Sequence, residues 1–147
     1  IDIIMHLINV FFSTLSILGL YLLTKKLFNK KIALITILLT LMNPFFFGHM
    51  GMNSKDIIVF FGFVWFCYYF YLYCTENENV FKNLIFFSFF IGFGCGVRLA
   101  LLMPILPIVL CGFYYLTKKY KLNYYSLLKR LSLHIPIAFF FCLFCIG

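Results

Sequence analysis

A short polar stretch between two apolar runs holds residue types that could do chemistry. It spans residues 47–56, and a second residue of this kind, Arg98, ends a later apolar run. The reactive members of the stretch are His49, Asn53, Lys55 and Asp56. Such side chains bind phosphate or hydroxyl groups and can move protons. We therefore take them, with Arg98, as the candidate functional site.

The charged members of this site each have more than one possible role. Asp56 could simply complement the dipole of the helix that it opens, behind a cap from Asn53 or Ser54. Lys55 could pair with Asp56 or bind a phosphate. Arg98 needs an anionic partner near membrane depth, and Asp2, Asp56 and a lipid phosphate all qualify.

A second group of polar residues is spaced along the first apolar run. Its members are separated by four, three, four and three positions, which places them on one helical face: Asp2, His6, Asn9, Ser13 and Ser16. Such a face should point into a helix bundle, where polar groups find partners. The stripe could serve hydrogen bonds between helices, or Asp2 and His6 could line a substrate cavity.

Composition excludes a soluble domain as the setting for these residues. The chain of 147 residues is 65% hydrophobic and 11% charged, against about 25% charged in soluble domains. We expect an all-α, polytopic transmembrane helix bundle, because backbone groups in lipid must be paired within each segment. The apolar segments are about six: roughly 3–23, 32–48, 57–74, 84–97, 99–116 and 131 to the end.

The distribution of basic residues predicts a topology. Ten of the twelve lie in the loops near residues 25–31, 75–83 and 117–130, and only Lys55 and Arg98 lie on the other side. By the positive-inside rule these loops are cytoplasmic, and Ile1 starts outside. One helix over 84–116 would be about 50 Å long, too long for a bilayer of about 30 Å, so we predict a break near Arg98. The segment before the break is then short.

The charge and the cysteines give no indication of a nucleic-acid-binding protein or of a metal site. A net charge of +8 confined to loops is a topology signal and does not indicate nucleic acid as a partner. All six cysteines lie in or beside apolar runs and are expected to be small hydrophobic residues, with no metal site and no cofactor. The chain is expected to form part of a single transmembrane domain over 1–147, with portions missing at both ends.

Three stretches resemble one family. Residues 43–57 resemble the P-x-x-F-G-H-x-x-x-N-x-K-D-I stretch of bacterial membrane proteins of the GT-C glycosyltransferase superfamily, which are similar to dolichyl-phosphate-mannose-protein mannosyltransferases. Residues 21–31 resemble the cytoplasmic Y-L-x-x-K-x-L-F turn of that superfamily. Residues 92–98 resemble its G-x-x-x-G-x-x-x-R/K helix end.

The resemblance implies transfer of a sugar from a polyprenyl-phosphate carrier on the outer face of the membrane. It also implies a main catalytic Asp in the first outward loop, which here would lie upstream of Ile1. Asp56 and Asp2 are then the candidates within the chain. The expected substrate-binding residues are His49, Asn53, Lys55, Arg98 and His6.

We therefore expect a glycosyltransferase of a bacterial cytoplasmic membrane, with a lipid-linked sugar donor and membrane lipid as partners. The main alternative is a transporter or flippase for an anionic lipid or solute, which would use the same polar groups without breaking a bond. A non-catalytic assembly subunit is a third possibility. An acidic first outward loop in the full gene would favour the enzyme.

Overall fold

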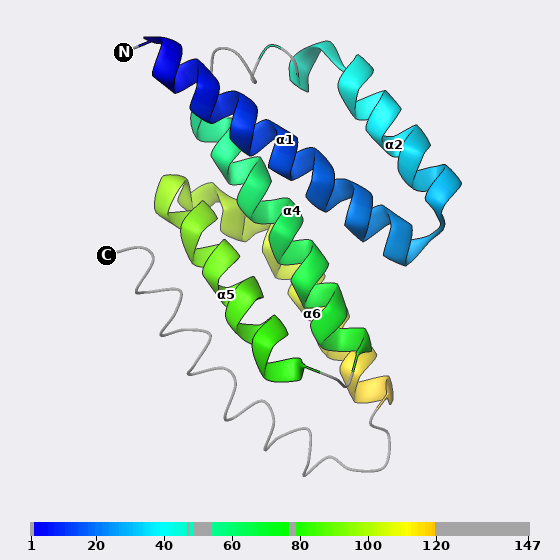
Figure 1. Cartoon of the computed structure of the whole chain (residues 1–147). Coiled ribbons are helices and arrows are strands. Elements are labelled where there is room, and N and C mark those ends of the chain that lie inside the picture. The colour runs from blue at the N-terminus through cyan, green and yellow to red at the C-terminus, as the bar shows by residue number, and fades with distance from the viewer. Residues whose placement is uncertain (1, 47, 49–53, 77–78, 120–147) are drawn as a thin grey trace.

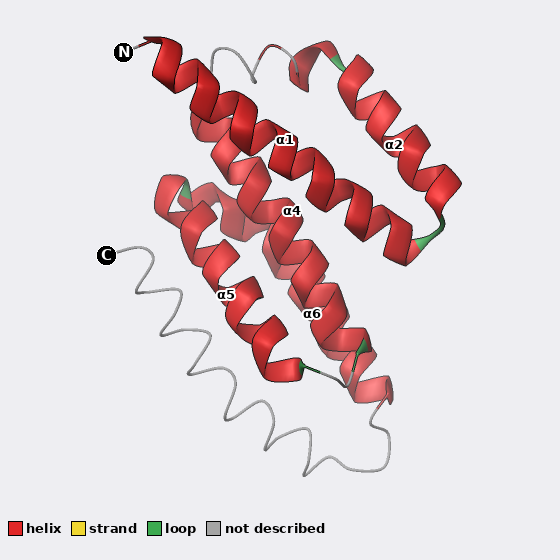
Figure 2. Cartoon of the chain, in the orientation of Figure 1, coloured by secondary structure: helices red, strands yellow, loops and turns green. Residues whose placement is uncertain are grey.

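The described part of the chain is a bundle of helices. The structure is a computed structural model that describes residues 2–46, 48, 54–76 and 79–119. Figures 1 and 2 show its elements, which are α1 (Asp2–Leu27), α2 (Lys30–Met42), α4 (Ser54–Thr75), α5 (Val80–Val97), the 3₁₀ turn η1 (Leu99–Leu101) and α6 (Leu102–Lys119). The prediction of an all-α polytopic bundle is confirmed, and four of these regions are long and apolar enough to cross a membrane: 3–27, 55–75, 80–97 and 99–119.

Helix α4 is the centre of the bundle, because it contacts α1, α5 and α6 (Figure 1). Its contact with α1 is in parallel register. The ring of Phe12 meets that of Phe61 with centroids 5.1 Å apart, and the indole Nε1 of Trp65 donates a hydrogen bond of 3.1 Å to the carbonyl of Leu15. In both contacts the residue number rises along α1 and along α4 together, which shows that the two helices run in the same direction.

Helices α4 and α5 are antiparallel and approach closely at two glycines. A Cβ atom built on Gly62 would lie 3.0 Å from the carbonyl oxygen of Phe90 and 3.1 Å from the Cα of Gly94. Small residues allow such close backbone packing in membranes, where apolar side chains gain little from leaving lipid. Aromatic rings fill the interface on either side, and Tyr69 stacks on Phe86 at 4.8 Å.

The predicted break near Arg98 is confirmed. Helix α5 ends at Val97, and Arg98 has an extended backbone with φ −148° and ψ 117°. Its amide still donates to the carbonyl of Gly94 at 3.1 Å, so the last turn of α5 is closed before the chain reverses through η1 into α6. The reversal places the end of α5 and the start of α6 at the same end of the bundle.

Three of the expected segments need correction or lie outside the described residues. Helix α2 has 13 residues, about 20 Å, and is too short to cross a bilayer alone; Asn43, followed by a proline, ends it. Helix α5 begins at Val80 and has 18 residues, so the segment before Arg98 is not short. The segment from 131 onward lies outside the described residues.

The polar stripe of α1 faces the interior along part of its length. Asn9, Ser13 and Ser16 are buried, as predicted, whereas His6 is exposed. In the register set by Phe12 and Trp65, His6 lies level with the first turn of α4, where the contact between α1 and α4 ends. The prediction of an inward-facing stripe is therefore right for the three inner positions and wrong for His6.

Candidate functional site

The end of α5 and the start of α4 bring two opposite charges together. Asp56 lies in the first turn of α4, and Arg98 follows the last residue of α5. Because the two helices are antiparallel, these positions share one end of the bundle. Nη1 of Arg98 lies 2.6 Å from Oδ1 of Asp56. Of the partners open to Arg98 from the sequence, the structure brings Asp56 to it.

Helix dipoles favour both charges of this pair. A carboxylate is stabilised near a helix N-terminus and a cation near a C-terminus, as Asp56 and Arg98 are here. The two side chains are 29% and 49% exposed, respectively. An ion pair this accessible contributes at most about 1 kcal/mol to stability. The pair is therefore weak evidence for a structural role and leaves the charged groups open to a ligand.

A cavity of about 300 Å³ lies directly beside the pair. It is lined by side chains from α4, from η1 and from the start of α6, with Arg98 at the junction: Asp56, Val59, Phe60, Phe63, Arg98, Ala100, Leu101 and Pro104. One end of the cavity is charged and the rest is apolar. Such a lining suits a ligand that joins an anionic group to a hydrophobic body. Arg98 thus belongs to the lining of this cavity, and its expected role in substrate binding stays a prediction.

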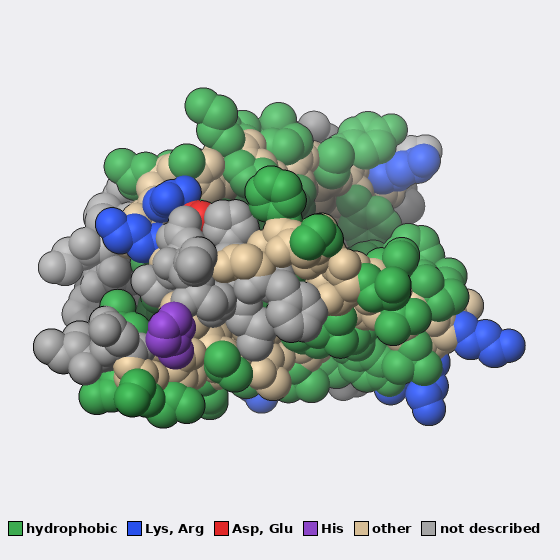
Figure 3. All heavy atoms as spheres, turned by 90° about the horizontal axis from the view of Figure 1, so that it is seen from above, with side chains coloured by type: hydrophobic (Ala, Val, Ile, Leu, Met, Phe, Trp, Pro, Cys, Tyr) green, Lys and Arg blue, Asp and Glu red, His purple; other side chains and the backbone are tan. Residues whose placement is uncertain are grey.

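Lys55 adds a second cation at this end of the molecule. It precedes Asp56 in the first turn of α4, and its side chain is exposed. Figure 3 looks onto the upper end of the view in Figure 1 and shows basic side chains beside an acidic group at this surface. Lys55 and Arg98 therefore give this end two cations that an anionic ligand could contact.

The structure describes only one of the other predicted site residues, His6, with its side chain. His49 and Asn53 lie outside the described residues. Asp2 is in the first turn of α1, but its side chain is not described. His6 belongs to α1, which contributes none of the cavity's described lining.

No metal-binding cluster of three or more His, Cys, Asp or Glu residues occurs within 2–46, 48, 54–76 and 79–119. The cysteines described there differ in burial. Cys74 and Cys95 are buried, as expected of small hydrophobic residues, whereas Cys111 is exposed.

The sequence interpretation missed the apolar part of the cavity. Phe60 and Phe63 line it from α4, but they are two of 22 phenylalanines, so nothing in their sequence context distinguishes them. Pro104 carried a clearer signal. A proline is well tolerated in the first turn of a helix, and the predicted break after Arg98 places it there.

Comparison with known protein families gives a match over nearly the whole chain. Residues 3–146 match a family model described as dolichyl-phosphate-mannose-protein mannosyltransferase. No curated protein and no solved structure matches the chain.

Proposed function

This chain belongs to the dolichyl-phosphate-mannose-protein mannosyltransferase family of membrane glycosyltransferases, and we propose that it acts on a polyprenyl-phosphate-linked sugar at the outer face of the membrane. The observation that carries this proposal is the ion pair of Arg98 and Asp56 beside an apolar cavity. A polyprenyl-phosphate sugar has an anionic phosphate joined to a long apolar chain. The cavity offers complementary surfaces to both.

Arg98 is proposed to bind the phosphate of the carrier. A guanidinium group has five N–H donors arranged as a fork, and the contact with Asp56 uses only part of that fork. The remaining donors can bind phosphate oxygens in pairs. Asp56 then fixes the orientation of the guanidinium before the donor arrives.

Transfer is proposed to proceed by direct displacement at the anomeric carbon of the sugar. The acceptor oxygen forms a bond to that carbon while the bond from carbon to phosphate oxygen breaks, and polyprenyl phosphate leaves with the electron pair. Arg98 and Lys55 stabilise the developing negative charge on the phosphate. A carboxylate accepts the proton of the acceptor, and Asp56 and Asp2 are the candidates within this chain.

The orientation of the site follows from the charges at the two ends of the bundle. The ends of α1 and α6 and the start of α2 carry six lysines: Lys25, Lys26, Lys30, Lys31, Lys118 and Lys119. The opposite end carries Lys55 and Arg98 with Asp56. By the positive-inside rule the lysine-rich end is cytoplasmic and the candidate site faces outward.

The full-length protein in sealed vesicles, with polyprenyl-phosphate mannose labelled in the sugar, tests the proposal. We expect label to leave the lipid and enter a product that no longer partitions with the carrier. Arg98→Ala should lower this transfer at limiting donor, whereas Lys82→Ala, an exposed change on α5 away from the site, should not.

Two outcomes would contradict the proposal. If the labelled lipid crosses the vesicle membrane intact, with no bond broken, the transporter alternative is right. If transfer occurs equally in the Arg98→Ala variant and the unaltered protein at every donor concentration, the cavity beside Arg98 is not the donor site.

A further inference from the structure

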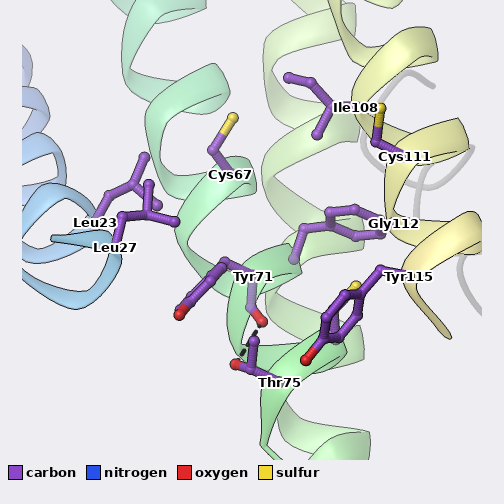
Figure 4. A pocket seen from close by; sticks show the side chains of 11 residues that line it. Leu23, Leu27, Cys67, Tyr71, Thr75, Ile108, Cys111, Gly112 and Tyr115 are labelled. Carbon is purple, nitrogen blue, oxygen red and sulfur yellow. Dashed lines mark hydrogen bonds between the residues drawn. The ribbon is translucent and has the colours of Figure 1, made fainter. Parts of the chain in front are cut away.

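A second, larger cavity lies at the opposite end of the bundle. It has a volume of about 500 Å³ and opens between α1, α4 and α6. Figure 4 shows it from close by, with Leu23 and Leu27 from α1 on one side and Ile108 and Cys111 from α6 on another. Its volume falls within the roughly 300–1,000 Å³ of small-molecule sites.

The lining of this cavity changes character along its length. Leucine, isoleucine, phenylalanine and cysteine side chains form most of the wall, and Gly112 leaves room where a Cβ atom would collide with the ring of Phe70. Hydroxyl groups gather at one end, where Figure 4 shows Tyr71, Thr75 and Tyr115 close to the last turns of α4 and α6.

Two lysines lie at this hydroxyl-bearing end. Nζ of Lys119 donates hydrogen bonds of 2.9 Å to the carbonyl of Thr75 and 3.2 Å to that of Cys74, and both residues line the cavity. Nζ of Lys26 lies 2.8 Å from Oε1 of Glu76, the next residue along α4. Lys118 adds a further exposed cation.

We propose that this cavity binds an anionic phospholipid of the cytoplasmic leaflet, with an acyl chain against the apolar wall and the head-group phosphate beside Lys119 and Tyr115. The charge at the mouth selects the occupant. An apolar groove alone would accept any lipid chain, but Lys118 and Lys119, at the end that faces the cytoplasm, favour an anionic head group. This site lies at the other end of the bundle from the proposed donor site and does not depend on sugar transfer.

The site is tested by lipid binding to the full-length protein, delipidated in detergent and titrated with dioleoyl phosphatidylglycerol or dioleoyl phosphatidylcholine. Both lipids have the same acyl chains, so native mass spectrometry of the bound species separates the contribution of the head group. We expect the anionic lipid to bind at lower concentrations than the zwitterionic one.

Two variants locate the binding. Lys119→Gln keeps an N–H donor for the carbonyls but removes the charge, and should weaken phosphatidylglycerol binding about fivefold. Cys111→Trp places a large ring in the cavity from an exposed position and should reduce the binding of both lipids. Lys82→Gln is the matched control, because it also removes one exposed lysine, here from α5. This variant should bind both lipids as the unaltered protein does.

Several results would overturn the proposal. Equal binding of the two lipids would show that the lysines do not select a head group. Equal weakening by Lys82→Gln and Lys119→Gln would show general surface charge rather than a site. Unchanged binding in a folded Cys111→Trp protein, or no lipid binding to the unaltered protein because another segment of the chain fills the cavity, would show that phospholipid does not occupy it.

Discussion

Nη1 of Arg98 lies 2.6 Å from Oδ1 of Asp56, which ties the end of α5 to the first turn of α4. This pair closes one side of a cavity whose remaining lining is mostly apolar. The relationship gives each residue a distinct expected role. Arg98 presents donors to an anionic ligand, and Asp56 holds those donors in place.

Arg98→Ala should weaken donor binding more than it slows turnover. A charge-assisted contact is worth about 1.5–3 kcal/mol, so KM for the polyprenyl-phosphate sugar should rise on the order of tenfold to a hundredfold. Arg98→Lys should recover only part of the loss, because an ammonium group cannot replace a planar fork. Initial rates across a donor series measure both effects. A normal KM in Arg98→Ala would contradict the assignment.

Asp56→Asn should chiefly lower kcat. The Arg98 guanidinium loses the carboxylate that orients it but keeps the N–H groups that bind the phosphate. In the double variant Asp56→Asn with Arg98→Ala, the loss should be smaller than the two single losses combined, since the side chains act as a pair. A double-mutant cycle on kcat/KM measures the coupling. If Asp56 only complements the helix dipole, the variant should instead lose about 1 kcal/mol of stability and keep normal activity per folded molecule.

Gly62→Val should disrupt the packing of α4 against α5. The added side chain would press on the backbone at Phe90 and Gly94, neither of which can rotate away, and overpacking of this kind costs about 1–3 kcal/mol. Unfolding of the purified protein in detergent, followed by circular dichroism, measures the loss. Gly48→Val is the control, because no atom of the described residues lies within 4 Å of a Cβ at that position. Equal stability of the two variants would be evidence against a close helix contact.

Asn9→Leu should leave the protein as stable or make it more stable. Asn9 is buried, and its Oδ1 has no hydrogen-bond partner within the described part of the chain. Removing a buried acceptor of this kind recovers a desolvation cost of about 1–3 kcal/mol. Ser13→Ala is the comparison, since the Ser13 hydroxyl already has a partner: it donates a hydrogen bond of 2.7 Å to the backbone carbonyl of Asn9. Marked destabilisation by Asn9→Leu would mean that the amide has a partner.

Single-cysteine labelling in a cysteine-depleted full-length protein should place Gly48→Cys outside and Lys30→Cys and Lys118→Cys inside. The expectation follows from the lysine-rich ends of α1, α2 and α6. An impermeant maleimide applied to sealed cells or inverted vesicles distinguishes the two faces. Labelling of position 48 from the cytoplasmic face alone would reverse the topology and remove the argument for an outward site.

The local features of this protein are readable from its sequence. Apolar runs long enough for a bilayer must become helices, because lipid leaves no other partner for the backbone. The break near Arg98 follows from length and charge, since a single helix would exceed the membrane and invert the basic loops. The polar stretch ending at Asp56 stands out because polar groups are costly within a membrane and are rare in this chain.

The lateral arrangement of the helices was not readable in the same way. A soluble helix shows its buried face through alternating polar and apolar residues, but membrane helices are apolar toward lipid and toward protein alike. The sequence therefore gave no sign that Phe60 and Phe63 line a cavity or that Leu23 and Cys111 share a groove. The apolar run over 32–48 also concealed the shortness of α2, although Asn43 and the proline after it mark where that helix ends.

By itself, then, the sequence determined the class, the uneven distribution of basic residues between the two ends and the residues able to do chemistry. The tertiary structure decided which of them meet. Arg98 had three possible anionic partners, and only the antiparallel packing of α5 on α4, through Gly62 and Gly94, brings it to Asp56. Contacts between distant residues depend on the rotation and register of whole helices, and these are set by packing over the entire interface rather than by local pattern.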